Sequence, residues 1–497
     1  MKQQLVEPLS ETTGDFPRAA PAPPVGMHAV TGAAWTVGMA TANKVLTVIG
    51  QIVLAWFLVP DDFGLIAMAC SFTAIGNLLT LGGLSDVLVQ RHSRFREDAP
   101  QVFWLSLSAS TFGAAAVALI SPLGGAIFHD ARVVPFIVIE ALCWPCDGAM
   151  TVYVARLKQE LRFKPLALVC LLMGMAHTGT AAVLAWRGCG AYALAFAPVA
   201  RRLTGVLGMR LAAGRIPLGK PHLREWPALL GPAAWLMLTG LFAAIYSNVA
   251  SFVLGIHCGP TQAGLYAWGL GLASQAAYLL SANLQQVLFP ALARLTQESE
   301  RQFAAFRQSI MTILAALAPL CVLQMVTAYP ALDLVFHDRW LQAAAVVSWL
   351  SFGMLTQPIV IVSSALLMAR GRYGFVALLG AIQAAAVATA AILGAHEGSA
   401  ALVARNVACA MFISGLLYGW AAFSEYGQGI LALATTIARP FLCVALSGLA
   451  GWAALRPVSA HSPAVQLGAT IVVFGCVYSI LAYTFMIRLV SELRSRL

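Results

Sequence analysis

Residues 53–67 of this 497-residue chain read VLAWFLVPDDFGLIA, and residues 253–267 read VLGIHCGPTQAGLYA. The two stretches share Val, Leu, Pro, Gly, Leu and Ala in one register, 200 residues apart. Adding Ala33–Trp35 and Ala233–Trp235 gives nine identities in 35 aligned positions without a gap. Chance in so apolar a composition would give roughly three, so the pattern indicates an internal duplication.

A second match supports the duplication. Pro122 is followed by Phe-His-Asp at 128–130, and Pro330 is followed by Phe-His-Asp at 336–338 with the same spacing. We therefore predict two parallel six-helix repeats, residues 28–220 and 221–425, related by an axis along the membrane normal. Paired bundles around a midplane cavity are typical of transporters. Residues 426–497 lie outside the repeat and are predicted to hold two further helices and a basic cytoplasmic tail.

The composition predicts an all-α polytopic membrane protein. Hydrophobic residues make up 60% of the chain and charged residues 10%, against about 25% in soluble domains. Mean hydropathy is +0.80, which also excludes a disordered chain. Apolar runs of about 20 residues suit membrane-spanning helices, and no alternating barrel pattern occurs. We count about 14 spans, near 33–58, 64–83, 102–124, 133–154, 166–186, 190–209, 228–256, 264–289, 308–328, 343–368, 374–394, 399–421, 430–453 and 464–487.

The placement of Lys and Arg predicts the orientation. Of 30 such residues, 21 fall on one side of the predicted spans, five on the other, and Lys44, Arg201, Arg202 and Arg439 within spans. The positive-inside rule then places both termini in the cytoplasm. Residues 1–27 are rich in Pro and lack an apolar core, so they are predicted to be a flexible tail. The net charge of +10 is thus a topology signal and not a sign of nucleic-acid binding.

Several segments in these spans resemble the polysaccharide transporter family, which holds the Wzx-type flippases for lipid-linked oligosaccharides. This family belongs to a superfamily with the MATE exporters and the lipid II flippases. The resemblance covers about residues 30–425. It is carried by Asp62–Met68 (DFGLIAM), Leu81–Leu84 (LGGL), Val89–Arg91 (VQR), Gln159–Phe163 (QELRF), Gly264–Tyr266 (GLY) and Leu288–Leu295 (LFPALARL).

The resemblance implies a non-enzymatic flippase of a bacterial inner membrane that works by alternating access without a cofactor. Its substrate would be a polyprenyl-pyrophosphate-linked glycan for exopolysaccharide, capsule or O-antigen synthesis. Membrane lipid would surround it, and polymerase or export machinery is a candidate partner. Similar proteins often carry an acid and a base on the seventh span, whereas residues 246–256 here have neither. Any coupling or contact role taken by analogy from that span is therefore in doubt.

Charges within the spans are the first candidate site residues, because an intramembrane charge is costly and often functional. Lys44, Thr47 and Gln51 share one helical face, which is either a cavity wall that meets pyrophosphate or a face that pairs with a neighbouring helix. Arg201 and Arg202 are candidate phosphate ligands because guanidinium binds phosphate with two hydrogen bonds. Adjacent residues point in different directions, so one of the two is expected to snorkel or pair.

Glu140 and Asp147 are seven residues apart on the fourth span and therefore share a face. A carboxylate in a low-dielectric cavity can exchange protons or bind sodium, which makes both candidates for ion coupling. The alternative is that Lys44 or an Arg neutralises them permanently.

Neutral polar residues form two further candidate stripes. Asn77 lies on a face of the second span with Thr73 and Thr80, and Gln285 follows Ser274, Tyr278 and Ser281 on the eighth. Such groups bind sugars, but small polar residues also pack membrane helices together.

Other motifs have simpler interpretations. Cys143 and Cys146 form a C-x-x-C pattern inside a span, so a kinked helix with two packing thiols is favoured over redox chemistry. Asp61 and Asp62 are interpreted as a turn into the second span. The rival interpretation is a metal site of a membrane glycosyltransferase or polymerase, which would be expected to have a long outer loop. A small-molecule exporter of the same architecture is the other alternative function. No nucleotide-binding or zinc motif occurs.

Overall fold

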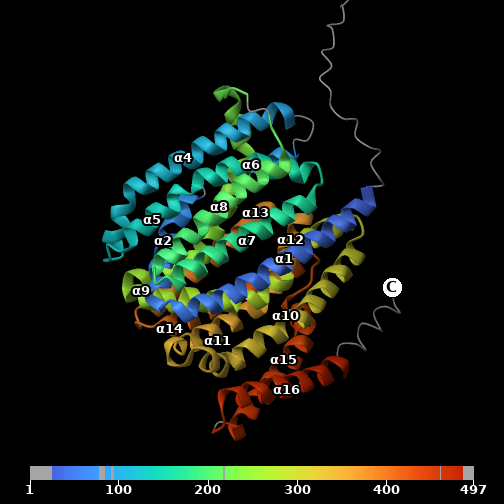
Figure 1. The fold of residues 1–497 in the computed structure, drawn as a ribbon. Helices are drawn as coiled ribbons and strands as arrows, with labels where there is room; N and C mark the ends of the chain where they lie inside the picture. Colours follow the sequence, from blue (N-terminus) through green and yellow to red (C-terminus); the bar gives the residue numbers. More distant parts are fainter. Residues whose placement is uncertain (1–24, 78–83, 91–94, 217–218, 459, 485–497) are drawn as a thin grey trace, which may run out of the picture.

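The computed structural model describes residues 25–77, 84–90, 95–216, 219–458 and 460–484, and their regular elements are all helices (Figure 1). Helices satisfy their backbone hydrogen bonds internally, as a lipid environment requires. The helices are α1 (Val25–Phe57), α2 (Pro60–Gly76), α3 (Leu84–Gln90), α4 (Phe95–Ile127), α5 (Val133–Leu142), α6 (Trp144–Gln159), α7 (Phe163–Trp186), α8 (Ala191–Ala213), α9 (Trp226–Arg294), α10 (Ser299–Phe336), α11 (Ala343–Gly353), α12 (Gln357–Ala369), α13 (Tyr373–Ala395), α14 (Ala400–Ser424), α15 (Ile430–Val458) and α16 (Pro463–Ala482).

The structure confirms an all-helical, multi-pass chain but not the count of 14 spans. Among the described residues, ten helices are long and apolar enough to cross a membrane, and Thr41–Phe57 is a shorter apolar helix. The predicted spans at 228–256 and 264–289 both lie in α9, whose backbone leaves helical geometry at Gly259 (φ +78°, ψ −179°), so that α9 comprises two helices that meet at this residue. The predicted span at 64–83 is described only as far as residue 77. The predicted N-terminal tail, residues 1–27, and the predicted basic cytoplasmic tail at the C-terminus lie mostly outside the described residues.

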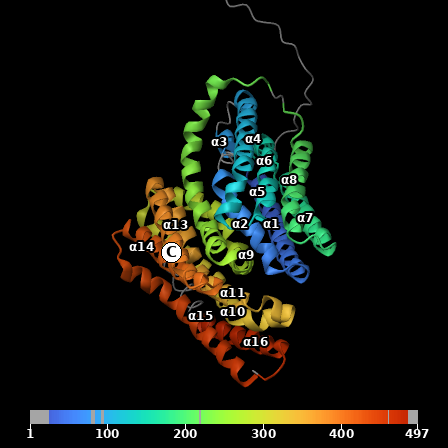
Figure 2. The same cartoon turned by 90° about the vertical axis from the view of Figure 1, so that its left-hand side faces the viewer.

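The helices fall into two groups (Figure 2). Helices α1–α8 lie together, and α10–α14 form a second group with α9, which also packs along α2. The last two helices, α15 and α16, pack against each other and against α10. Two ends of the bundle are named here by the segments between helices. The Asp61 end holds residues 58–61, 128–132, 259–261 and 337–340, and the basic end holds 159–162, 214–216, 219–225, 295–298 and 370–372.

The duplicated motif forms a close contact between the two helix groups. A Cβ atom added to Gly64 would overlap the carbonyl oxygen of Pro260, and one added to Gly264 would overlap that of Pro60. Small residues allow membrane helices to approach this closely. The contact is reciprocal at a spacing of 200 residues, which is the pattern expected from the predicted two-fold axis.

A turn at the basic end repeats in the two helix groups. Leu161 and Gly371 both have positive φ, +54° and +74°. After each, the next N–H donates to a carbonyl five residues back, from Arg162 to Leu157 and from Arg372 to Leu367, at 2.9 Å in both cases. The Leu and the Arg of this turn are identical in the two copies, whereas the residue with positive φ differs.

Candidate functional site

A cavity of about 350 Å³ lies between the two helix groups. Ala67 and Cys70 of α2 line one side, and α9 supplies most of the polar wall. Its polar groups come from Tyr246, Ser247, Asn248, Ser251 and Ser274, and none of its lining residues is charged. Residues 246–256, which lack the acid and the base often found on the seventh span of similar proteins, therefore contribute to an uncharged polar wall.

The structure brings Gln51 to the edge of this cavity. The Gln51 side-chain oxygen accepts a hydrogen bond from the Gln275 amide of α9 at 3.2 Å. A Cβ atom on the cavity-lining Gly271 would collide with the Gln51 amide. Gln51 therefore links α1 to the other helix group. Gln275 was missed by the sequence analysis, because the polar stripe considered there follows Ser274 instead.

Lys44 and Asn77 are not among the described residues that line the cavity. Lys44 is half-buried on α1, two turns before Gln51 and on the same face. Asn77 ends α2 as its C-cap, with its N–H directed at the carbonyls of Ile75 and Thr73. The side chain of Gln285 lies outside the described residues.

Arg202 joins the two carboxylates of the fourth predicted span. Its guanidinium donates two hydrogen bonds to Glu140, at 2.7 and 3.2 Å, and one to Asp147 at 2.9 Å. The side chains of Arg202, Glu140 and Asp147 are 14%, 18% and 30% exposed. The fork of donors on α8 therefore holds carboxylates from α5 and α6 together, and we call this group the Arg202 triad.

With both carboxylates ionised, the Arg202 triad carries one excess negative charge. Arg201, the adjacent residue, is exposed and makes no ion pair or hydrogen bond within the described part of the chain. The triad lies behind α2 as seen from the cavity, since the cavity-lining Cys70 is close enough to Glu140 and Arg202 to interact with their charges. Arg202 is thus committed to carboxylates and not presented to the cavity.

The break between α5 and α6 places the two acids on opposite sides of Cys143 while keeping them on one face. The helix ends at Leu142 and restarts at Trp144, with Pro145 in the first turn. Cys143 and Cys146 are free thiols, and the Cys143 sulfur donates to the Ile139 carbonyl. The prediction of a kinked helix is confirmed.

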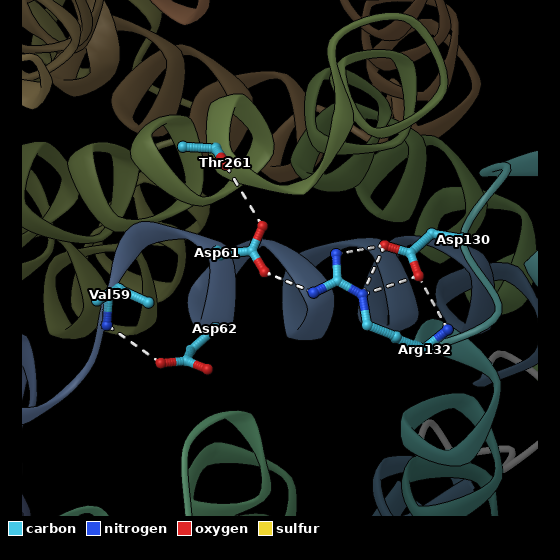
Figure 3. A network of polar contacts seen from close by, with 6 residues as sticks. All are labelled: Val59, Asp61, Asp62, Asp130, Arg132 and Thr261. Atoms are coloured by element: carbon cyan, nitrogen blue, oxygen red, sulfur yellow. Dashed lines mark hydrogen bonds and ion pairs between the residues drawn. The ribbon is translucent and has the colours of Figure 1, made fainter.

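At the Asp61 end, an ionic network within the first helix group is linked to the second group by a hydrogen bond from Thr261 of α9 (Figure 3). Arg132 donates to Asp61 at 3.0 Å and to Asp130 at 2.8 Å, and Thr261 donates to Asp61 at 3.3 Å. Hydrogen bonding to Arg132 lowers the pKa of Asp130, and the same bonds raise the pKa of Arg132. Asp62 accepts from the Val59 N–H at 3.1 Å and so starts α2. The predicted turn is confirmed, and both acids serve structural contacts in it.

Further contacts at the Asp61 end involve two tryptophans. The Trp340 indole donates to the Ala55 carbonyl at 2.9 Å, and its ring meets Phe63 edge-on at 5.3 Å. The Trp56 indole donates to the Val335 carbonyl at 3.3 Å, and Arg339 donates to the Trp56 carbonyl at 3.0 Å. This end is therefore closed by an extensive polar and aromatic contact between the two groups.

Closure at the basic end is of a different kind. Trp226 and Met237 of α9 pack against a cluster that contains Leu84, Leu88 and Val102. Among the described residues, this contact is apolar and is made by α9. The two ends of the cavity are therefore sealed by different chemistry.

Comparison with known families identifies the class. Residues 53–345, more than half of the chain, match the family model described as "Polysaccharide biosynthesis protein". The chain belongs to this family.

Individual relatives can be aligned with most of the chain. It is 24% identical over 477 residues to the succinoglycan biosynthesis transport protein ExoT of Rhizobium meliloti (strain 1021), which covers 92% of this chain and 94% of that one. It is 24% identical over 359 residues to the lipopolysaccharide biosynthesis protein WzxC of Escherichia coli (strain K12), covering 69% and 70%. Among solved structures, the fold resembles the lipid II flippase MurJ in an inward closed conformation, with TM-score 0.73, 13% identity and coverage of 92% and 99%. An inward-facing MATE family transporter gives TM-score 0.64 at 14% identity, with coverage of 79% and 96%.

Proposed function

We propose that this protein is a flippase for a polyprenyl-pyrophosphate-linked oligosaccharide and works by alternating access. The observation that carries the proposal is the uncharged polar cavity, whose wall is built jointly by α2 of one helix group and α9, α13 and α14 of the other. A head group held there is exposed to either side when the groups separate at one end. Membership of a polysaccharide biosynthesis family, with named transport relatives, indicates a glycan cargo.

The lipid carrier would meet the protein at α1. Gln51 reaches the cavity edge, and Lys44 lies two turns away on the same face. An ammonium there suits the pyrophosphate that joins glycan and polyprenyl chain. The polyprenyl tail would remain in the bilayer.

The Arg202 triad is proposed to couple transport to a cation. One guanidinium facing two carboxylates leaves one negative charge, so a proton or sodium ion could bind at Glu140 or Asp147 without loss of the Arg202 contacts. The helices that carry the triad, α5 and α8, pack against α2, so cation binding there would act on α2. Arg201 is left for contact with phosphate or lipid.

The proposed orientation places both termini in the cytoplasm of a bacterial inner membrane. The Asp61 end then faces outward and the basic end inward, as the excess of Lys and Arg predicts. Residues 28–220 and 221–425 would move as two units, with glycan passing from the inner to the outer leaflet.

The decisive experiment is mass spectrometry of polyprenyl-linked glycans in the host after depletion of this protein. We expect a complete repeat unit to accumulate on its pyrophosphate carrier while surface polysaccharide is lost. Re-expressed wild type should restore export, and so should the control variant Lys220→Ala, which changes an exposed residue. Lys44→Ala should restore export to less than about a tenth of the wild-type level, since a charge-assisted contact contributes roughly 1.5–3 kcal/mol.

Two results would contradict the proposal. A truncated glycan on the carrier would indicate a glycosyltransferase instead. An unchanged carrier pool with full surface polysaccharide would favour a small-molecule exporter of the same fold.

A further inference from the structure

A second cavity of about 360 Å³ lies among α9, α12, α13 and α14. Four aromatic rings line it, from Phe242, Tyr246, Tyr373 and Tyr418, and Gln383 projects from α13 into the same space. The volume falls near the lower limit of small-molecule sites, about 300–1,000 Å³. It is therefore large enough for a small cyclic ligand.

Two largely buried side chains keep their polar atoms accessible at the surface of this cavity. Gln383 is 9% exposed and Tyr418 is 5% exposed, and neither has a fully buried polar atom. Neither makes a hydrogen bond with any other residue in the described part of the structure. A ligand with hydroxyl groups could therefore hydrogen-bond with both.

The remaining wall favours an uncharged ligand. All ten lining residues are neutral. The nearest basic side chains, Arg370 and Arg372, are ion-paired with Glu425 at 3.9 and 3.1 Å and do not line the cavity. An anionic ligand would lose its hydration there without gaining a partner charge.

Aromatic rings beside an amide and a phenol match the chemistry of a neutral sugar. The ring C–H groups of a sugar are apolar and pack on aromatic faces, while its hydroxyls both donate and accept hydrogen bonds. Gln383 supplies two donors and an acceptor oxygen, and the Tyr418 hydroxyl supplies one donor and an acceptor. This one cavity thus offers partners both for the apolar face of a hexose ring and for its hydroxyl groups.

Tyr246 connects this cavity to the central one. Its side chain lines both, so the two spaces meet at one residue of α9. A chain of sugars held in the central cavity could extend past Tyr246 into the second. The cavity is therefore placed to take one end of an extended oligosaccharide.

We propose that Phe242, Tyr246, Gln383 and Tyr418 form a subsite for an uncharged sugar ring and select neutral sugars over uronic acids. The proposal rests on the proposed function, because it gives that cavity a glycan to hold. Gln383 and Tyr418 bond the hydroxyl groups, and the aromatic rings pack against the apolar face of the ring.

The test is saturation-transfer NMR on the purified full-length protein in lipid nanodiscs. The probes are the methyl glycosides of glucose, galactose and mannose, each compared with methyl glucuronide. We expect at least one neutral glycoside to bind and the glucuronide to bind at least about tenfold more weakly. Gln383→Leu and Tyr418→Phe should each weaken neutral binding by about two- to tenfold, the value of one hydrogen bond.

Two matched variants serve as controls. Gln342→Leu and Tyr329→Phe make the same chemical changes at exposed positions and should leave binding unchanged. Tyr418→Phe removes a single oxygen atom, so it remains informative if Gln383→Leu does not fold.

Absence of a signal from all three glycosides overturns the subsite, as does equal binding of glucuronide or unaltered binding by Tyr418→Phe. Failure of the proposed function gives a different result, namely an unchanged carrier-linked glycan pool after depletion. If neutral glycosides bind as expected in that case, the sugar subsite stands while the flippase proposal does not.

Discussion

At the scale of single residues, Arg201 and Arg202 differ in burial and in ion pairing although they are adjacent in the sequence. Arg202 holds two carboxylates, whereas Arg201 is exposed beside it. In a low-dielectric interior a buried charge is tolerated when it is paired, and removal of one partner leaves the others uncompensated.

We therefore predict that Arg202→Ala destabilises the protein by about 3–5 kcal/mol, because Glu140 and Asp147 lose their shared partner. Arg201→Ala should change stability by less than about 0.5 kcal/mol. Thermal unfolding of the purified variants measures both. Adding Glu140→Gln and Asp147→Asn to Arg202→Ala should recover part of the loss. Equal effects at positions 201 and 202 would show that the triad does not stabilise the fold.

The sequence predicted half of this arrangement. The spacing of seven placed Glu140 and Asp147 on one face, but Lys44 and the two arginines remained open as partners. Which of two adjacent arginines faces α5 and α6 depends on the rotation of α8, and tertiary packing sets that rotation. Gln383 and Tyr418 gave no signal at all, since each is an isolated polar residue in an apolar helix.

At the scale of helices, the crossing of α2 and α9 is set by two glycines. The carbonyls of Pro60 and Pro260 occupy the space that side chains at Gly264 and Gly64 would need. Because these carbonyls are backbone atoms, they cannot rotate away as a side chain would.

Gly64→Ala and Gly264→Ala are each expected to destabilise the protein by about 1–3 kcal/mol through overpacking. The matched control is Gly179→Ala in α7, where an added Cβ meets no atom within 4 Å. That change should stabilise by up to about 1 kcal/mol through helix propensity. Unfolding temperatures of the three variants make the comparison. If Gly64→Ala were as stable as Gly179→Ala, the close contact would be refuted.

The sequence revealed this crossing only as a repeat. Identity at Pro60 and Pro260 indicated a duplication but did not show that the two copies touch. The break expected between the spans at 228–256 and 264–289 lies at Gly259, where the backbone leaves helical geometry and two helices meet. A single glycine with positive φ makes this break, so the two helices follow each other without a separate loop.

At the scale of the whole molecule, the two ends of the central cavity differ. The Asp61 end is closed by the hydrogen bond from Thr261 to Asp61, by indole hydrogen bonds and by the glycine crossing, and the described part of the basic end by apolar packing of Trp226 and Met237. Alternating access requires the Asp61 end to open during each cycle.

A disulfide between Asp61→Cys and Thr261→Cys should therefore block glycan export by at least about tenfold under oxidising conditions, and a reductant should restore it. These side chains already approach to 3.3 Å across the two groups. The background would lack the ten native cysteines. Surface polysaccharide provides the readout.

The control pair for this experiment is Gln262→Cys with Ala400→Cys, which joins two helices of one group where the wild-type residues are hydrogen-bonded at 2.9 Å. Oxidation of this pair should leave export unchanged. Full export from the oxidised Asp61–Thr261 pair would show that this end need not open.

The Arg202 triad also has a consequence for how the chain is made. Asp147 precedes Arg202 by 55 residues and Glu140 precedes it by 62. At about 5–20 residues per second, synthesis of this interval takes on the order of 3–12 s. During that time α5 and α6 carry two carboxylates whose partner has not been translated. We expect the insertion machinery to retain this hairpin, sheltered from lipid, until α8 arrives and neutralises it.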